Sequence, residues 1–309
     1  MPQAPARTVA LMSNKGGVGK THLAVNIAIQ CAREGNRVLL VDADLGSANA
    51  DIKLGARPRA TLLDYYKRRA DIFDCLSPTD YGIHFLAGCN GDYSLANLGH
   101  QQKIRLLKGF DKLVERGGYT HIFFDLGAGI GTRVLDFALV ADECVIVATP
   151  QDIVSAYAGL KACWIRYGGL TGMHYFRDRT GGREIRMAGG NGERQSLRVG
   201  FILNQVSSLE EGKRIYFRIL DVARSFFQAS EETPPLRIRY LGGVPYVHGL
   251  LRESEKLKMP AMVLYPYHPF THAIREIAWV LLDMQPLAPN RLQVPFGDRV
   301  KGVIRTLVS

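Results

Sequence analysis

A glycine-rich turn near the amino terminus, with the sequence SNKGGVGKTH, contains residues whose types and spacing could bind phosphate. Glycines in such a turn let the backbone approach an anion closely, with its N–H groups directed inward. Lys20 can reach terminal phosphates, and the Thr21 hydroxyl can bind Mg²⁺. The turn follows an apolar run and opens a helical pattern, the context that a phosphate-binding loop requires. The expected cofactor-binding residues here are Gly16, Gly17, Val18, Gly19, Lys20, Thr21 and His22.

Three aspartates follow apolar runs that read as buried strands. Asp42 and Asp44 stand at the end of VLLVDADLG, and Asp125 stands at the end of HIFFD. Mg²⁺ and an attacking water both need carboxylates, and parallel strands place their carboxyl ends at one edge of a sheet. Aspartates also end strands for turn or capping reasons, but their occurrence beside a phosphate loop favours a functional role.

Lys15 is a second cation in the same turn, five residues before Lys20. A second positive charge near a triphosphate stabilises the charge that develops during phosphoryl transfer, as an arginine finger does. The chemistry of the residues does not say which subunit's nucleotide Lys15 would touch. The alternative is a solvated loop lysine with no such role.

The elements that must position these residues alternate along the chain. Helical patterns occupy THLAVNIAIQCARE, which stops at Gly35, and FTHAIREIAWVLLDM, which ends before Pro286. Between the helical segments, apolar runs suit buried parallel strands. This order predicts an α/β fold with a doubly wound, mainly parallel sheet and helices on both faces. The predicted strands are Thr8 to Met12, Val38 to Val41, Ile83 to Ala87, His121 to Phe124, Val145 to Ala148 and Val199 to Leu203.

Composition limits the class of protein. The 309 residues are 47% hydrophobic, enough for a full core, and the formal net charge of +10 favours attraction to nucleic acid or an acidic membrane surface. The five cysteines are scattered without a two-residue spacing, which favours reduced thiols over a metal or disulfide framework. No signal peptide and no membrane-spanning segment of ~20 apolar residues are expected.

Two stretches interrupt the alternating pattern. Residues 171–198 are rich in Gly and Arg and are interpreted as an insertion in a domain that covers 1–285. Residues 286–295 contain prolines and are interpreted as a linker, which leaves a separate carboxyl-terminal segment, 296–309.

The motifs resemble those of the MinD and ParA family of deviant-Walker P-loop ATPases. The likeness spans roughly residues 7 to 283 and rests on KGGVGKT, LLVDADLGSANAD, FFDLGAGI, ILNQV and GGVPYVHGLLRESEKLKMPAM, in the family's order. Within the family, GAGI and DADLGSANADIKLG are most similar to the FlhG, or FleN, branch, which regulates flagellar number and placement. The resemblance implies a MinD-like P-loop fold and a Mg²⁺-dependent ATPase whose cofactors are ATP and Mg²⁺.

The resemblance also implies roles for individual residues. Lys20 and Thr21 would bind phosphates, and Thr21, Asp42 and Asp125 would hold Mg²⁺. Asp44 would position the attacking water, so that the expected catalytic residues are Lys15, Lys20 and Asp44. Lys15 would reach across a dimer interface to the partner's phosphates, and Asn204 and Pro245 would contact the adenine.

The carboxyl-terminal segment, FGDRVKGVIRTLVS, has the pattern of an amphipathic helix. Its apolar side carries Phe296, Val300 and Val303, and its other side carries Lys301 and Arg305. This pattern is typical of a helix at a membrane interface, and the resemblance implies the same for 296–309. One such tail binds weakly, whereas two tails on a dimer bind more firmly. The alternative is that the apolar side packs on the chain's own domain, but the preceding linker favours the membrane.

The expected function is an ATP-driven dimerisation switch of FlhG type, cytoplasmic and peripheral on the inner face of the cell membrane. Its expected partners are a second copy of the chain, the membrane, and flagellar or polar-complex proteins. A ParA-type partitioning or positioning ATPase bound to DNA is the alternative, motivated by the net charge. An iron–sulfur ATPase would need cysteines just after Asp125 or a close pair near the carboxyl terminus, and a tyrosine kinase would need a tyrosine cluster in the tail; the chain has none of these features.

Overall fold

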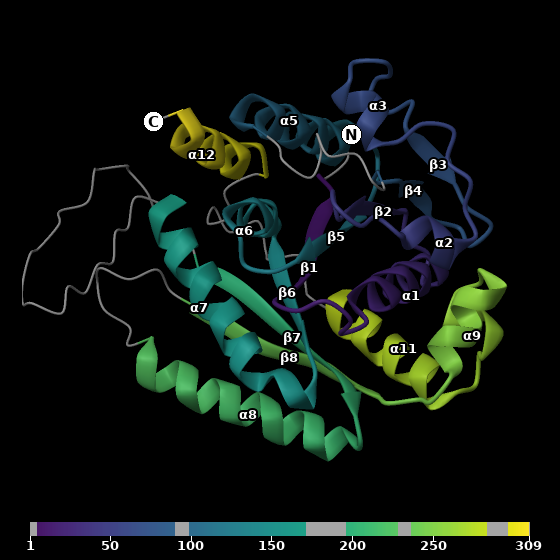
Figure 1. The fold of residues 1–309 in the computed structure, drawn as a ribbon, viewed down its shortest axis with the longest axis vertical. Helices are drawn as coiled ribbons and strands as arrows, with labels where there is room; N and C mark the ends of the chain where they lie inside the picture. The colour runs from purple at the N-terminus through teal and green to yellow at the C-terminus, as the bar shows by residue number, and fades with distance from the viewer. Residues whose placement is uncertain (1–4, 90–98, 171–195, 228–235, 283–295, 309) are drawn as a thin grey trace, which may run out of the picture.

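The computed structural model describes residues 5–89, 99–170, 196–227, 236–282 and 296–308. They build an eight-stranded sheet in the order β3-β4-β2-β5-β1-β6-β7-β8, shown in Figure 1. Only the β3–β4 pairing is antiparallel, and all the others are parallel. The strands are β1 (Arg7–Ser13), β2 (Val38–Ala43), β3 (Leu76–Pro78), β4 (His84–Leu86), β5 (His121–Ala128), β6 (Glu143–Ala148), β7 (Leu197–Val206) and β8 (Leu236–Pro245).

Helices cover both faces of the sheet, and an apolar core lies under each layer. One layer consists of α1 (Lys20–Arg33), α2 (Ala50–Leu54), α9 (Leu250–Leu257), α10 (Ala261–Leu264) and α11 (Pro269–Leu282). The other consists of α3 (Leu62–Tyr66), α5 (His100–Arg116), α6 (Thr132–Leu139), α7 (Ile153–Leu170), α8 (Leu209–Phe226) and α12 (Phe296–Val308), and the turn η1 (Pro150–Asp152) precedes α7. The predicted doubly wound, mainly parallel fold is confirmed.

All six predicted strands are present, and two further strands were not predicted. β3 is three residues long and lies at an edge, too short to give a pattern. β8 lies at the other edge, where Arg237 and Arg239 alternate with Ile238 and Tyr240 and break the apolar run. The sequence signal for a buried parallel strand is a continuous apolar run, and an edge strand lacks it.

Strand pairing brings the phosphate turn and the aspartates to the same edge of the sheet. Asp42 and Asp125 are register partners on β2 and β5, and β1 lies directly beside β5. The turn after β1 therefore emerges next to both carboxylates. In open α/β sheets, ligands bind at this carboxyl edge.

The carboxyl-terminal helix, α12, packs on the domain. Phe296, Val300 and Val303 are buried, and the Phe296 ring stacks on Phe124 with 6.3 Å between centroids. The helix predicted over 296–309 thus exists, but its apolar side faces the protein core rather than a membrane surface. The packing follows the alternative from the sequence, because α5, α7 and β5 offer an apolar surface to the apolar side of α12.

Only some of the segment boundaries predicted from the sequence lie within the described residues. The predicted linker at 286–295 and most of the predicted insertion at 171–198 lie outside the described residues. The end of that insertion was placed too late, since Leu197 and Arg198 already belong to β7. None of the helices in the described ranges is long and apolar enough to cross a bilayer.

Candidate functional site

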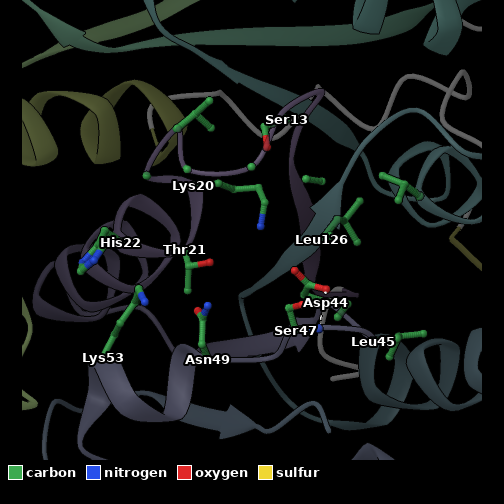
Figure 2. Close-up of a pocket in the computed structure, with 18 of the residues that line it drawn as sticks. Ser13, Lys20, Thr21, His22, Asp44, Leu45, Ser47, Asn49, Lys53 and Leu126 are labelled. Carbon is green, nitrogen blue, oxygen red and sulfur yellow. Dashed lines mark hydrogen bonds between the residues drawn. The ribbon is translucent and has the colours of Figure 1, made fainter. Parts of the chain in front are cut away.

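A cavity of about 680 Å³ opens where the turn after β1 meets the carboxyl edge of the sheet. Its walls include the turn from Gly16 to His22, the segment around Asp44, and the α9 residues Leu251, Arg252 and Glu255. Figure 2 shows Lys20 and Thr21 on one side of this space, with Asp44 and Ser47 facing them. The volume is in the range of sites for small ligands and cofactors.

Gly19 shapes the turn. It precedes α1 in the left-handed region, at φ 86°, and a Cβ atom there would collide with the Asn204 amide nitrogen. That amide donates a 2.7 Å hydrogen bond to the carbonyl of Val18. Glycine is therefore required both by its backbone angles and by the close approach of Asn204. The N–H groups at the start of α1 are left to face the cavity, as anion binding needs.

Lys20 and Asp125 form a buried ion pair. Lys20 Nζ lies 2.5 Å from Asp125 Oδ1, and the two residues are 7% and 1% exposed. The second oxygen, Asp125 Oδ2, is buried without a hydrogen-bond partner among the described residues. A buried acceptor without a donor is costly, and its occurrence beside a phosphate turn points to a ligand.

The two other aspartates organise the loop that follows β2. Asp42 Oδ2 accepts hydrogen bonds from the backbone N–H groups of Asn49 and Ala50, at 2.9 and 3.0 Å. Asp44 Oδ1 accepts from the N–H groups of Gly46 and Ser47, at 3.2 and 3.1 Å. Asp44 lines the cavity, and these two backbone hydrogen bonds hold its carboxylate.

The carboxylates suit a divalent cation. Burial, followed by the negative charge of Asp125, raises the pKa of Asp42 to about 7. Two neighbouring carboxylates and one lysine leave an excess of negative charge that a cation would relieve. The described residues contain no group of three or more His, Cys, Asp or Glu able to hold a metal by themselves. Mg²⁺ commonly uses one or two carboxylates together with substrate phosphates and water.

Lys15 differs from the other residues of the turn. Ser13 and Gly16 line the cavity, whereas Lys15 is not among the described residues that line it. The Lys15 ammonium instead forms an ion pair with Asp152 in η1, and its side chain is 58% exposed. Lys15 thus stands at the rim, outside the cavity of its own chain.

Two residues were expected to contact the adenine base, and they do not line the cavity as the phosphate turn does. Asn204 is buried against Val18, and neither Asn204 nor Pro245 is part of the described lining. Gln205 does line the cavity, with an unusual φ of 62°. Contact of Asn204 and Pro245 with adenine therefore stays a prediction.

Four residues around the cavity were missed by sequence reasoning. Arg133, Lys53 and Glu255 line the cavity, and Asp152 pairs with Lys15. Asp152 follows the apolar run of β6, so its position after a strand was a usable signal. Lys53 and Glu255 lie in short helices, where charged residues usually indicate a solvated face.

Comparison with known proteins agrees with this geometry. The family model for the CobQ/CobB/MinD/ParA nucleotide-binding domain matches residues 9–260. The chain is 28% identical to the antiactivator FleN of Pseudomonas aeruginosa, covering 93% of this chain and 89% of FleN. It is 25% identical to the flagellum site-determining protein YlxH of Helicobacter pylori, covering 93% and 85%.

Solved structures share the fold. The cell division ATPase MinD of Pyrococcus furiosus superposes with a TM-score of 0.66 at 19% identity, over 90% of this chain and 99% of MinD. MinD of Pyrococcus horikoshii, solved with Mg-ADP, gives 0.62 at 21% identity, over 94% and 100%. The family model covers most of the chain, and the phosphate turn lies within its match. The chain therefore belongs to the CobQ/CobB/MinD/ParA family of nucleotide-binding domains.

Proposed function

We propose that this chain is a Mg²⁺-dependent ATPase of FlhG type that dimerises on ATP, binds the membrane reversibly and regulates the number or placement of flagella. The observation that carries the proposal is the position of Lys15 at the rim of the cavity. A lysine within a phosphate turn that does not face its own cavity can serve a second subunit once its ion pair with Asp152 opens. A cation supplied by a partner is an effective way to couple hydrolysis to association.

The chemistry of hydrolysis follows from the residues around the cavity. Backbone N–H groups from Gly16 to Thr21 would hold the phosphates, and Lys20 would turn from Asp125 towards them. Mg²⁺, held by Thr21 and by the carboxylates of Asp42 and Asp125, would neutralise the phosphate oxygens. Asp44 would orient the water that attacks the γ-phosphate, with its carboxylate held by two backbone N–H groups.

Reversible membrane binding would use α12. In the structure its apolar side is buried, so contact with lipid requires that α12 leave the domain first. A single amphipathic tail binds weakly, and two tails on one dimer bind far more firmly. Membrane attachment would then follow the oligomeric state.

The flagellar role is supported by the relatives. FleN is named as an antiactivator and YlxH as a flagellum site-determining protein, and both align with more than nine-tenths of this chain. The structure itself supports the switch, whereas the choice of a flagellar target is supported by these two relatives alone.

Light scattering tests the switch. Wild-type protein should have its monomer mass of 34.3 kDa with ADP and twice that mass with ATP. Asp44→Ala should dimerise and stay dimeric because hydrolysis stops, whereas Lys15→Ala should bind nucleotide and remain monomeric. A wild-type monomer under every nucleotide condition would refute the switch.

Sedimentation with acidic liposomes tests the membrane part. ATP-dependent binding should disappear when residues 296–309 are removed, while the ATP-driven increase in mass remains. ATP-dependent retention on non-specific DNA that falls steeply with added salt, without liposome binding, would favour the ParA-type alternative.

A further inference from the structure

Three charged or titratable side chains from three helices meet at the flank of the cavity. Glu255 Oε1, on α9, lies 2.9 Å from His22 Nε2 on α1 and 3.0 Å from Lys53 Nζ on α2. His22 and Lys53 are each 7% exposed, whereas the Glu255 side chain is 46% exposed. Figure 2 shows His22 and Lys53 beside each other, next to Thr21. All three residues line the cavity, so this cluster forms part of its wall.

The protonation of the cluster follows from its hydrogen bonds. Burial raises the pKa of Glu255, but the hydrogen bonds from Lys53 and His22 outweigh it and leave that pKa below the ordinary value. An ionised carboxylate only accepts, so His22 must carry its proton on Nε2.

The two donors fix the orientation of the carboxylate. Both bonds reach Oε1, and among the described residues none reaches Oε2. Two nearly buried donors thus hold Glu255, a residue of the cavity wall, in place and leave its Oε2 without a hydrogen bond from any described residue. A held carboxylate with a spare oxygen is a strong acceptor for a hydroxyl group.

The position of Glu255 in the cavity wall suits contact with the sugar of a nucleotide. Phosphates bound by the turn from Gly16 to Thr21 would occupy one part of the cavity, and His22 is the next residue along α1. The cavity continues from the turn to Leu251, Arg252 and Glu255 on α9. In a nucleotide the ribose follows directly after the α-phosphate, so the sugar would lie along this wall.

We propose that Glu255, held by His22 and Lys53, accepts a hydrogen bond from a ribose hydroxyl and makes the site selective for ribonucleotides over deoxyribonucleotides. Glu255 is then a specificity-determining residue, and His22 and Lys53 are positioning residues. This inference rests on the proposed function, because it requires that an adenine nucleotide bind in the cavity.

A purely structural role for the cluster is the competing explanation. Glu255 joins α9 to α1 and α2, and α2 also approaches α9 where Gly55 faces the carbonyl of Lys258, 2.6 Å from where a Cβ atom would stand. A structural bridge would change stability and the affinity for all nucleotides equally. Only discrimination between sugars separates the two explanations.

The test is calorimetric titration of the full chain with Mg²⁺ and ADP, 2′-deoxy-ADP or 3′-deoxy-ADP. Wild type should bind at least one deoxy analogue about tenfold more weakly than ADP, the loss expected for one charge-assisted hydrogen bond. Glu255→Ala should bind ADP and that analogue with equal affinity. Glu253→Gln is the matched control, since Glu253 lies on the same helix, pairs with the Tyr265 hydroxyl and is not part of the described lining. It should keep the wild-type ratio.

Two outcomes would overturn the inference: equal wild-type affinity for ADP and both analogues, or a ratio that Glu255→Ala leaves unchanged. The wild-type measurement alone decides the first and does not depend on the folding of any variant. If wild type binds no adenine nucleotide at all, the proposed function itself fails. Binding of ADP without sugar discrimination refutes the ribose contact only.

Discussion

Lys15 of the phosphate turn forms an ion pair with Asp152, the last residue of η1, directly before α7. The hydrogen bond from Lys15 is the largest influence on Asp152 and lowers its pKa. The pair holds the lysine at the rim, away from the cavity of its own chain. If Lys15 serves a second subunit, this ion pair must open when the dimer forms, and Asp152 competes with the partner's phosphates for the lysine.

Asp152→Asn should therefore favour dimerisation. The ion pair is partly exposed and its contribution is small, so we expect the ATP-bound dimer to form at protein concentrations lower by up to about fivefold. Sedimentation velocity over a dilution series with ATP measures the change. Glu276→Gln, which breaks the surface pair of Glu276 with His272, is the control and should leave the dimerisation constant unchanged. Weaker dimerisation of Asp152→Asn would mean that Asp152 itself belongs to the interface.

Gly19→Ala should impair nucleotide binding much more than it impairs folding. The side chain would meet a φ of 86°, which disfavours L residues by roughly 1–2 kcal/mol, and would also displace the Asn204 amide from Val18. We expect the affinity for ADP to fall at least about tenfold.

Gly35→Ala is a matched control for the backbone strain that an L residue has at a positive φ. Gly35 has the same φ of 86°, but a Cβ atom there meets nothing within 4 Å. It should lower the free energy of unfolding by roughly 1–2 kcal/mol and leave ADP affinity unchanged. Thermal melting and calorimetric titration of both variants separate the two effects. Equal losses of affinity would show that Asn204 does not support the turn.

Strands and the phosphate turn could be predicted because their signals are local. Val38 to Val41 is a continuous apolar run, and the glycines of the turn follow such a run directly. The Lys15–Asp152 pair could not be predicted, because it depends on strand order. Asp152 meets Lys15 only because β6 lies beside β1, although the two residues are far apart in the sequence.

The carboxyl-terminal helix shows a second limit. Its periodicity predicts an apolar side correctly, but the same pattern suits a membrane interface and a protein surface equally. Contact of Phe296 with Phe124 decides for the protein surface in this structure, and that contact depends on the path of the whole chain. Glu255 was missed for a similar reason, since its partners His22 and Lys53 lie on other helices.

Docking of α12 should depend on pH through Asp111 on α5. Asp111 Oδ1 is buried without a hydrogen-bond partner among the described residues, and a Cβ atom on Gly297 would lie 2.8 Å from it. Burial, followed by the charge of Glu115, raises the pKa of Asp111; Asp298 acts in the same direction and Lys301 opposes it. A raised carboxyl pKa stabilises the folded state at low pH. This stability is lost as the pH rises from the ordinary value of 3.8 through the raised value.

Asp111→Asn should therefore raise the melting temperature, by an amount of the order of 1 °C, more at about pH 8 than at about pH 5. Melting curves at the two pH values give the comparison. Asp221→Asn, at an exposed position on α8, is the control and should not reproduce the pH-dependent gain. An equal shift at both pH values would exclude Asp111 as the titrating group.

Arg299 anchors α12, and its removal should release the helix. Arg299 Nε donates to the carbonyl of Val140 at 2.8 Å, and Nη2 donates to Asp142 Oδ1 at 2.7 Å. Burial raises the pKa of Asp142, but Arg299 and the hydrogen bonds from Thr8 reverse the effect and hold that pKa below its usual value. Loss of Arg299 removes the ion pair with this carboxylate and leaves it the hydrogen bonds from Thr8, which should weaken the docked state by about 3 kcal/mol.

Arg299→Ala should thus bind acidic liposomes without ATP, and hydrogen exchange over 296–308 should accelerate. Arg305→Ala should act in the opposite direction. Arg305 is exposed on α12, so its removal leaves docking intact but takes away a positive charge worth about 1 kcal/mol at an anionic surface. Sedimentation of both variants with liposomes, with and without ATP, distinguishes the effects. If Arg299→Ala exchanges faster but gains no lipid binding, α12 is a structural element of the domain, because a released amphipathic helix with a membrane role would bind.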